Sequence, residues 1–172
     1  CKLFVSDINR DVSTANYWHC DSLDFESVNE LLLKTKPDFI YHLVGSFSNE
    51  YEKDYAANVL ATKNVLEAVR NLEKDCRVML FGSAAEYGVV VKGENPIKES
   101  RALRPVSVYG LTKAYQTALM HYYLNALNLD IVMARPFNIF GRGISSKLFV
   151  GRVYQQIQLA SIFRQLGVKI NK

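Results

Sequence analysis

The chain has 172 residues and a mass of 19.5 kDa, which is enough for one domain with a hydrophobic core and short for two. Hydrophobic residues make up 49% of the chain and charged residues 22%, a balance that excludes disordered, collagen-like and low-complexity proteins. The formal net charge is +4, and the basic residues are scattered without forming a stripe. This pattern favours an anionic small molecule over a nucleic acid as the partner.

Membrane and disulfide-stabilised classes are also disfavoured. No apolar run approaches the roughly 18 residues that a membrane-spanning helix needs, and the chain does not open with a basic segment followed by an apolar stretch. The cysteines Cys1, Cys20 and Cys76 lie far apart and form no C-x-x-C pair. We therefore expect a cytoplasmic protein with buried thiols, no disulfide framework and no metal site.

Short apolar strands alternate with longer helices along the chain. The strands are apolar runs that end at polar or Gly/Pro positions, and the helices repeat apolar residues at helical spacing. In chain order we predict strand 2–6, helix 26–34, strand 39–44, helix 51–72, strand 77–81, helix 107–127, strand 130–134 and helix 147–166.

This alternation predicts an α/β fold with a doubly wound parallel sheet, because strands that are buried on both faces have continuous apolar runs. There is no internal repeat, no Gly/Ser or Pro linker and no second block of elements, so residues 1–172 are predicted to belong to one domain. In such sheets ligands bind outside the carboxyl ends of the strands. Gly45, Ser83 and Asn138 fall at those ends.

Tyr109 and Lys113 are four residues apart in the predicted helix 107–127, so they share one helix face. A nearby ammonium group favours the ionised form of a phenol and allows it to exchange a proton with a substrate oxygen. The alternative is a solvated helix face, where such pairs are common.

Ser83 and Asn138 each follow a predicted strand. Ser83 lies among small residues that allow a close approach to a ligand, and its hydroxyl can bind a substrate oxygen; alternatively, it caps a turn. Asn138 offers an amide in a glycine-containing loop, which as a plain loop would need no function.

Taken together, several segments resemble the extended short-chain dehydrogenase/reductase family, the NAD-dependent epimerases, dehydratases and reductases of nucleotide sugars. The resemblance covers about residues 21–158. It rests on Asp21-Ser22 after a short strand, the segment 37–45 (PDFIYHLVG), Asn58 with 62–68 (TKNVLEA), 82–88 (GSAAEYG), Tyr109-x-x-x-Lys113 and 135–138 (RPFN). Within the family, residues 82–88, 103–109 and 149–157 are similar to the GDP-4-dehydro-6-deoxymannose reductases.

The resemblance implies a role for each matching residue. It makes Tyr109 the proton donor or acceptor at the sugar C4 oxygen, Lys113 the cation beside it, and Ser83 the group that positions the reacting oxygen. The catalytic residues would be Ser83, Tyr109 and Lys113. The substrate would be bound by Ser83, Glu86 and Asn138. The cofactor would be bound by Asp21, Ser22, Leu43, Val44, Gly45, Asn58, Tyr109, Lys113 and Pro136.

The implied function is reduction of a 4-keto-6-deoxy sugar nucleotide with a nicotinamide cofactor. The family's 4,6-dehydratases carry an acidic residue at the position of Ala85, so that activity is disfavoured here. A 4-epimerase or dehydratase of the same family and a catalytically idle nucleotide-binding relative remain alternatives. The family also implies a homodimer through its two long helices, with Tyr115, Leu119, Tyr122 and Tyr123 on that surface or, alternatively, packed on the sheet.

The family's glycine-rich turn, which places a pyrophosphate at a helix N-terminus, has no match in these residues. Its expected place is before Cys1. We therefore expect a Rossmann-like domain without its first strand and turn, and with the substrate-binding C-terminal portion largely absent. Asp7 would favour NAD by accepting from a ribose hydroxyl, whereas Arg10 would favour NADP by pairing with a 2′-phosphate. The resemblance leans toward NADPH.

Overall fold

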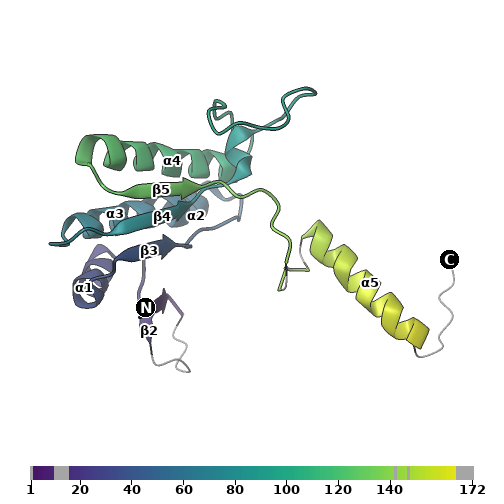
Figure 1. The fold of residues 1–172 in the computed structure, drawn as a ribbon, viewed down its shortest axis with the longest axis horizontal. Coiled ribbons are helices and arrows are strands. Elements are labelled where there is room, and N and C mark those ends of the chain that lie inside the picture. Colours follow the sequence, from purple (N-terminus) through teal and green to yellow (C-terminus); the bar gives the residue numbers. More distant parts are fainter. Residues whose placement is uncertain (1, 10–15, 142, 147, 166–172) are drawn as a thin grey trace. The chain divides into compact units, whose positions relative to one another are not determined.

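The computed structural model describes residues 2–9, 16–141, 143–146 and 148–165. The chain divides into two compact units, Cys1–Pro136 and Phe137–Lys172. The strands and helices α1 to α4 belong to the first unit, and α5 (Phe149–Gln165) belongs to the second (Figure 1). Within these ranges, no helix is long and apolar enough to cross a membrane.

The first unit contains the strands and helices predicted from the periodicity. It comprises, in chain order, β1 (Val5–Asp7), β2 (Tyr17–His19), α1 (Phe25–Thr35), β3 (Phe39–His42), α2 (Tyr51–Tyr55), η1 (Ala56–Leu60), α3 (Ala61–Arg70), β4 (Arg77–Phe81), η2 (Ala84–Tyr87), α4 (Val108–Leu127) and β5 (Ile131–Ala134). The helix predicted over 51–72 consists of α2, η1 and α3 in succession. β2 lies ahead of Asp21, where the family resemblance placed a short strand.

The strand pairs are parallel, as predicted. β1 pairs with β2, and β3, β4 and β5 form a second sheet in that order. In the second sheet Ile40 lies opposite Val78, and Val78 lies opposite Ile131. These parallel sheets with flanking helices confirm the Rossmann-like α/β fold class.

The core is formed by the three-stranded sheet and by helices α1, α3 and α4 (Figure 1). Successive strand residues point to opposite faces of a sheet, so Val78 and Leu80 share one face of β4. Both are fully buried on the side of the core. On the opposite face Phe39, Tyr41 and Val132 are exposed. In the first unit, helices therefore cover one face of this sheet, whereas the sequence predicted cover on both.

Two further predictions concern side chains in this core. Cys20 and Cys76 are buried free thiols, as expected, while Cys1 lies outside the described residues. Tyr123 is also buried, and its hydroxyl donates to Glu67. It therefore packs inside the fold, while Tyr122 remains exposed on α4.

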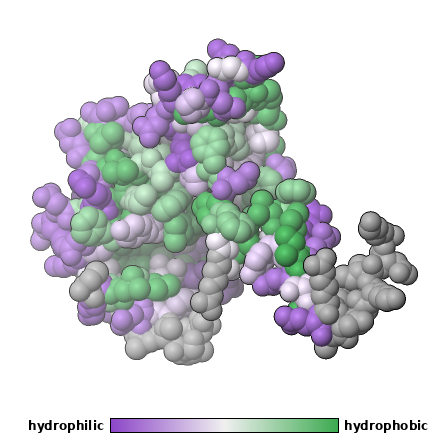
Figure 2. Space-filling model, turned by 45° about the vertical axis from the view of Figure 1, so that its right-hand side comes forward, coloured by the Kyte–Doolittle hydropathy of each residue, from purple (hydrophilic) through white to green (hydrophobic). Residues whose placement is uncertain are grey.

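The surface carries apolar side chains among the polar ones. Figure 2 shows hydrophobic residues gathered in several areas between hydrophilic ones. Isolated apolar side chains at a surface are ordinary, since a folded protein lacks enough polar groups to cover itself. These areas alone define no site.

Local signals fix the helices that position the site. The Ser107 hydroxyl accepts a hydrogen bond from the backbone N–H of Gly110 at 3.0 Å, which caps α4 at its start. α4 ends at Asn128, which adopts the left-handed conformation with φ 54°. Between α2 and α3, the π-helical segment η1 widens the turn that carries Asn58. Such π segments are frequent at functional sites.

Candidate active site

The carboxyl ends of β3, β4 and β5 meet at one edge of the sheet, as the parallel arrangement requires. Beyond the last strand pair, the backbone N–H of Gly82 donates to Ala134 O at 2.8 Å, and that of Ala84 donates to Pro136 O at 3.0 Å. These two bonds hold the segment around Ser83 beside Pro136. The sequence predicted Ser83 at this edge.

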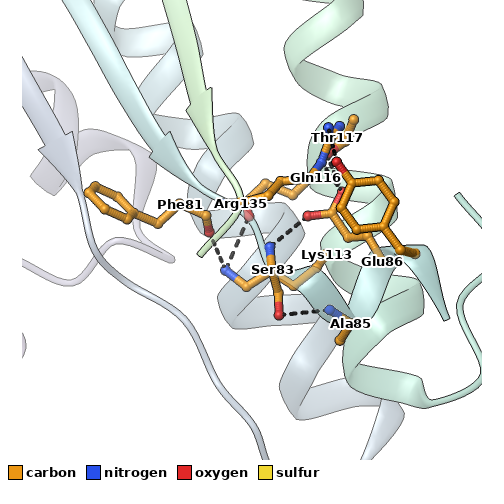
Figure 3. Close-up of polar contacts among 9 residues, drawn as sticks. Phe81, Ser83, Ala85, Glu86, Lys113, Gln116, Thr117 and Arg135 are labelled. Carbon is orange, nitrogen blue, oxygen red and sulfur yellow. Dashed lines mark hydrogen bonds and ion pairs between the residues drawn. The ribbon is translucent and has the colours of Figure 1, made fainter. Parts of the chain in front are cut away.

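Ser83 begins the short helix η2, and its hydroxyl accepts from the backbone N–H of Ala85 at 3.2 Å (Figure 3). Its own backbone N–H donates to Glu86 Oε1 at 2.7 Å, which completes a capping box. A hydroxyl that accepts one hydrogen bond still has a proton to donate. Ser83 therefore combines the capping role considered in the sequence with a hydroxyl proton available for a ligand.

Glu86 is fully buried, and both of its carboxylate oxygens have protein partners. Besides Ser83, it accepts from the Thr117 hydroxyl at 2.6 Å and from Arg135 Nε at 2.9 Å (Figure 3). The side chain of Arg135 is 16% exposed and that of Glu86 is not exposed at all. These contacts make Glu86 a support of the Ser83 segment, and its role toward a substrate remains a prediction.

Helix α4 packs closely against η2 at Gly110. A Cβ atom at this position would lie 2.6 Å from the carbonyl oxygen of Ala85, so only glycine allows this contact. The contact brings the start of α4, with Tyr109, next to the segment that follows Ser83. The half-buried Tyr109 ring also meets the exposed Phe47 edge to face, with ring centroids 4.8 Å apart.

Lys113 is 5% exposed, and its ammonium group lies against the end of β4 (Figure 3). Nζ donates to the carbonyl oxygen of Phe81 at 2.8 Å and to Gln116 Oε1 at 3.1 Å. Burial lowers the pKa of Lys113 to about 8, although the nearby Glu86 carboxylate opposes the shift. At pH 7 the group is still mostly a cation, so it can stabilise negative charge at this edge.

Asn58 connects three elements from a fully buried position in η1. Its Nδ2 donates to Ser46 O at 3.0 Å and to the Thr112 hydroxyl at 2.9 Å, and its Oδ1 accepts from Ser46 N at 3.0 Å. Gly45 lies directly beside it, since a Cβ there would be 2.9 Å from Asn58 Oδ1 and 3.3 Å from Lys113 Nζ. The structure thus brings together Gly45, Asn58 and Lys113, three of the predicted site residues.

The loop after β3 is held by a buried carboxylate that the sequence reasoning missed. Asp54 Oδ1 accepts from Ser46 Oγ, Ser48 N and Ser48 Oγ, each at 2.8 Å, and Oδ2 accepts from Asn49 N at 3.0 Å. Burial alone would raise the pKa of Asp54, but these hydrogen bonds outweigh it and hold the pKa below its ordinary value. The available signal was the polar series Asp54, Asn58 and Thr62, spaced by four residues along one helix face.

The other predicted cofactor residues lie at the ends of strands. Leu43 and Val44 follow β3 and are 70% and 40% exposed. Asp21 and Ser22 follow β2 and precede α1; the Asp21 carboxylate accepts from Leu23 N at 2.9 Å. Their backbones and turns are therefore fixed by the protein, and their roles toward a cofactor remain predictions.

The remaining residues that the sequence singled out are Asn138, Asp7 and Arg10. Asn138 is exposed and belongs to the second unit. Asp7 ends β1 and accepts from Asn9 N at 2.8 Å, whereas Arg10 lies outside the described residues. Across the described part of the chain, no group of three or more His, Cys, Asp or Glu side chains could hold a metal ion.

The fold and the site together define a Rossmann-like α/β protein. Ser83, which follows β4, and the buried Lys113 of α4 lie at the carboxyl edge of its parallel sheet, where such sheets bind nucleotides, and Tyr109 is on the same helix as Lys113.

Comparison with known proteins identifies the family. The model of the "NAD dependent epimerase/dehydratase family" matches residues 5–162 of this chain. UDP-glucose 4-epimerase from Mycoplasma genitalium is 28% identical over 134 residues, 73% of this chain and 38% of that protein. GDP-6-deoxy-D-mannose reductase from Pseudomonas aeruginosa is 27% identical over 142 residues, 80% of this chain and 46% of that protein. The chain belongs to the NAD dependent epimerase/dehydratase family.

A solved structure shows the same fold. RMD from Pseudomonas aeruginosa complexed with NADPH has a TM-score of 0.76 to this chain at 22% identity, and the match covers 93% of this chain and 55% of that one. The chain spans less than half of the length of the two curated relatives.

Proposed function

We propose that the protein reduces the C4 ketone of a 4-keto-6-deoxy sugar nucleotide with a nicotinamide cofactor. The observation that carries this proposal is the buried ammonium group of Lys113, fixed at the carboxyl edge of the sheet on the helix that presents Tyr109. A fixed cation near a phenol and a serine hydroxyl is suited to moving one proton to a carbonyl oxygen.

Reduction is favoured over dehydration because Ala85 stands where the family's dehydratases carry an acid. Glu86, the adjacent acid, cannot replace it, since its carboxylate is enclosed by Ser83, Thr117 and Arg135. The relative from Pseudomonas aeruginosa that bears the name GDP-6-deoxy-D-mannose reductase supports the same activity and a GDP-linked sugar.

The residues at this edge fit the nicotinamide end of such a cofactor. An ammonium group has three protons, and Lys113 donates two of them to Phe81 O and Gln116 Oε1, so the third is suited to a ribose hydroxyl. Gly45 lets the backbone pass close to Lys113, since a Cβ there would be 3.3 Å from Lys113 Nζ. Pro136 and the exposed Leu43 and Val44 would provide apolar contacts along the cofactor.

A reduced nicotinamide, when bound at this edge, would supply a hydride to C4 of the sugar. The Tyr109 hydroxyl gives its proton to the ketone oxygen, so hydride and proton together convert the carbonyl into an alcohol. Ser83 donates a hydrogen bond to the same oxygen. Lys113 stabilises the negative charge left on Tyr109 until a proton from solvent restores the phenol.

The test is the oxidation of NADPH, followed at the nicotinamide absorbance band, with GDP-4-dehydro-6-deoxymannose and the full-length protein. Tyr109→Phe should lower turnover by about 10²–10⁴-fold while leaving NADPH affinity within about twofold, because only the proton donor is lost. Tyr41→Phe is the matched control on the exposed face of the sheet and should retain full activity.

The alternative outcomes are distinct. Equal turnover in Tyr109→Phe would refute the proton-transfer role. NADPH binding without reduction of any keto-sugar would indicate an idle relative. Interconversion of UDP-glucose and UDP-galactose would instead indicate a 4-epimerase, the activity named for the Mycoplasma genitalium relative.

The remaining parts of the proposal concern assembly and location. We infer a cytoplasmic homodimer that forms through the helices of the first unit, with Tyr115 and Tyr122 in the interface. The two side chains are 39% and 55% exposed. A monomeric mass in light scattering at micromolar concentration would refute the dimer.

A further inference from the structure

Three buried polar side chains lie behind Lys113 and take no part in the mechanism above. Gln116 and Thr62 are fully buried, and His42 is 4% exposed. They come from α4, α3 and β3, so three separate elements converge on the inner side of the ammonium group.

The hydrogen bonds among them have one consistent direction. Lys113 donates to Gln116 Oε1 at 3.1 Å, and Gln116 Nε2 donates to the Thr62 hydroxyl at 2.8 Å. The Thr62 hydroxyl donates its single proton to the carbonyl oxygen of Asn58 at 2.9 Å. His42 Nε2, 3.1 Å from the same hydroxyl oxygen, must therefore be the donor in that contact.

The same network reaches the backbone of Tyr109. Asn58 Nδ2 donates to the Thr112 hydroxyl at 2.9 Å, and Thr112 donates to the carbonyl oxygen of Tyr109 at 3.0 Å. These hydrogen bonds thus link the Lys113 ammonium group to the backbone carbonyl of Tyr109, in addition to the helix that the two residues share.

Such a network is costly unless every member is satisfied, and an apolar side chain of similar size would fill the position of Gln116 without that cost. The amide also has a fixed orientation. Turning it over would point its NH₂ group at the ammonium and its oxygen at Thr62, whose proton is already donated. The arrangement therefore holds a hydrogen-bond acceptor toward Lys113 at one defined place.

We propose that Gln116, fixed by Thr62 and His42, is the positioning residue that sets the place and the protonation of the Lys113 ammonium group. The role rests on the proposed nicotinamide chemistry, because Lys113 acts there as a cation toward the cofactor and Tyr109. Gln116 itself acts only through Lys113.

The charges around Lys113 agree with this role. The titratable groups that interact electrostatically with it are Glu86 from η2 and His42 from β3. Burial, and then the positive charge of Lys113, lower the pKa of His42 to about 4. His42 is therefore neutral near pH 7, so the network of Gln116, Thr62 and His42 adds no second positive charge beside the ammonium group.

The test measures the dissociation constant of NADPH or NADH, whichever the full-length protein binds more tightly, between pH 6 and 10. The readout is the midpoint, the pH at which cofactor affinity is half lost as the pH is raised and Lys113 loses its proton. Gln116→Glu places an anion against the ammonium group and should move this midpoint upward by about one pH unit. Gln116→Leu removes an acceptor and should move it downward by about half a unit or more. A side chain that only fills space would not produce shifts of opposite sign.

Two further variants complete the experiment. Asn125→Asp adds the same charge at an exposed position of α4, about 18 Å from Lys113 along the helix, and should leave the midpoint unchanged. Thr62→Val keeps the shape but frees Gln116, so it should lower the midpoint even if Gln116→Glu does not fold.

An unchanged midpoint in folded Gln116→Leu and Thr62→Val would overturn the proposal. Failure of the proposed reduction would be recognised separately, because the midpoint would then shift as expected while no keto-sugar is reduced.

Discussion

Replacing Glu86 by glutamine should destabilise the protein far more than the same replacement at a surface ion pair. Glu86→Gln keeps the shape of the side chain and can keep one oxygen toward the backbone N–H of Ser83. The second oxygen, which accepts from Thr117 and Arg135, becomes an NH₂ group. The Thr117 hydroxyl can rotate to accept from that group, whereas the guanidinium of Arg135 can only donate.

The size of the effect follows from what Arg135 loses. A hydrogen bond to a charged group contributes about 1.5–3 kcal/mol, and breaking a buried ion pair costs about 3–5 kcal/mol. Arg135 is 16% exposed and keeps a contact with the Tyr87 ring at 5.5 Å, which offsets part of the loss. We expect the free energy of unfolding to fall by about 3 kcal/mol.

Equilibrium unfolding in urea measures this quantity, and the chain offers a matched control. Glu94 pairs with Arg101 at 2.8 Å, the arginine is again 16% exposed, and the Glu94 side chain is 38% exposed. Glu94→Gln should therefore cost no more than about 1 kcal/mol. A loss below about 1 kcal/mol in Glu86→Gln, or equal losses in both variants, would show that Glu86 does not support the Ser83 segment in this way.

Two other predictions follow from the same contacts. The unfolded chain protonates His42 near pH 6.5 and the folded protein only at about pH 4, so the free energy of unfolding should fall as the pH drops between these values. The loss should approach about 3 kcal/mol in urea unfolding and should disappear in His42→Gln; a flat profile in the parent protein would contradict it. Gly45→Ala puts a methyl group 2.9 Å from Asn58 Oδ1 and 3.3 Å from Lys113 Nζ, and should weaken NADPH binding about tenfold. Gly141→Ala, where an added Cβ meets nothing within 4 Å, should bind NADPH as the parent does, and equal affinities in the two variants would count against the Gly45 contact.

The parallel sheet and the place of the site could be predicted because both depend on short stretches of sequence. The apolar runs at 39–44 and 77–81 are the strands β3 and β4, and the residue types just beyond them, Gly45 and Ser83, fall at the carboxyl edge as expected. Parallel order follows from the helix between them, since such crossovers place consecutive strands in one direction.

The buried hydrogen-bond partners of these residues could not be predicted from the sequence in the same way, because they depend on contacts between distant segments. Gln116 and Thr62 are 54 positions apart, and so are Asn58 and Thr112. Glu86 illustrates the difficulty, since its type suggests a ligand contact and only the partners Thr117 and Arg135 show that it is enclosed. A polar residue on an otherwise apolar helix face is the signal that the sequence does contain.

The site therefore rests on two separate supports, one for the Ser83 segment and one for the Lys113 ammonium group. Glu86 and Arg135 hold the Ser83 segment, while Gln116 and Thr62 hold Lys113, and the hydrogen bonds described here do not join the two sets. They interact through charge, because the Glu86 carboxylate raises the pKa of Lys113 against the larger effect of burial. This arrangement keeps the lysine charged inside the protein while its hydrogen bonds leave one proton for a ligand. A change in either support should therefore alter the pKa of Lys113: a change at Gln116 through its hydrogen bond, and a change at Glu86 through its charge.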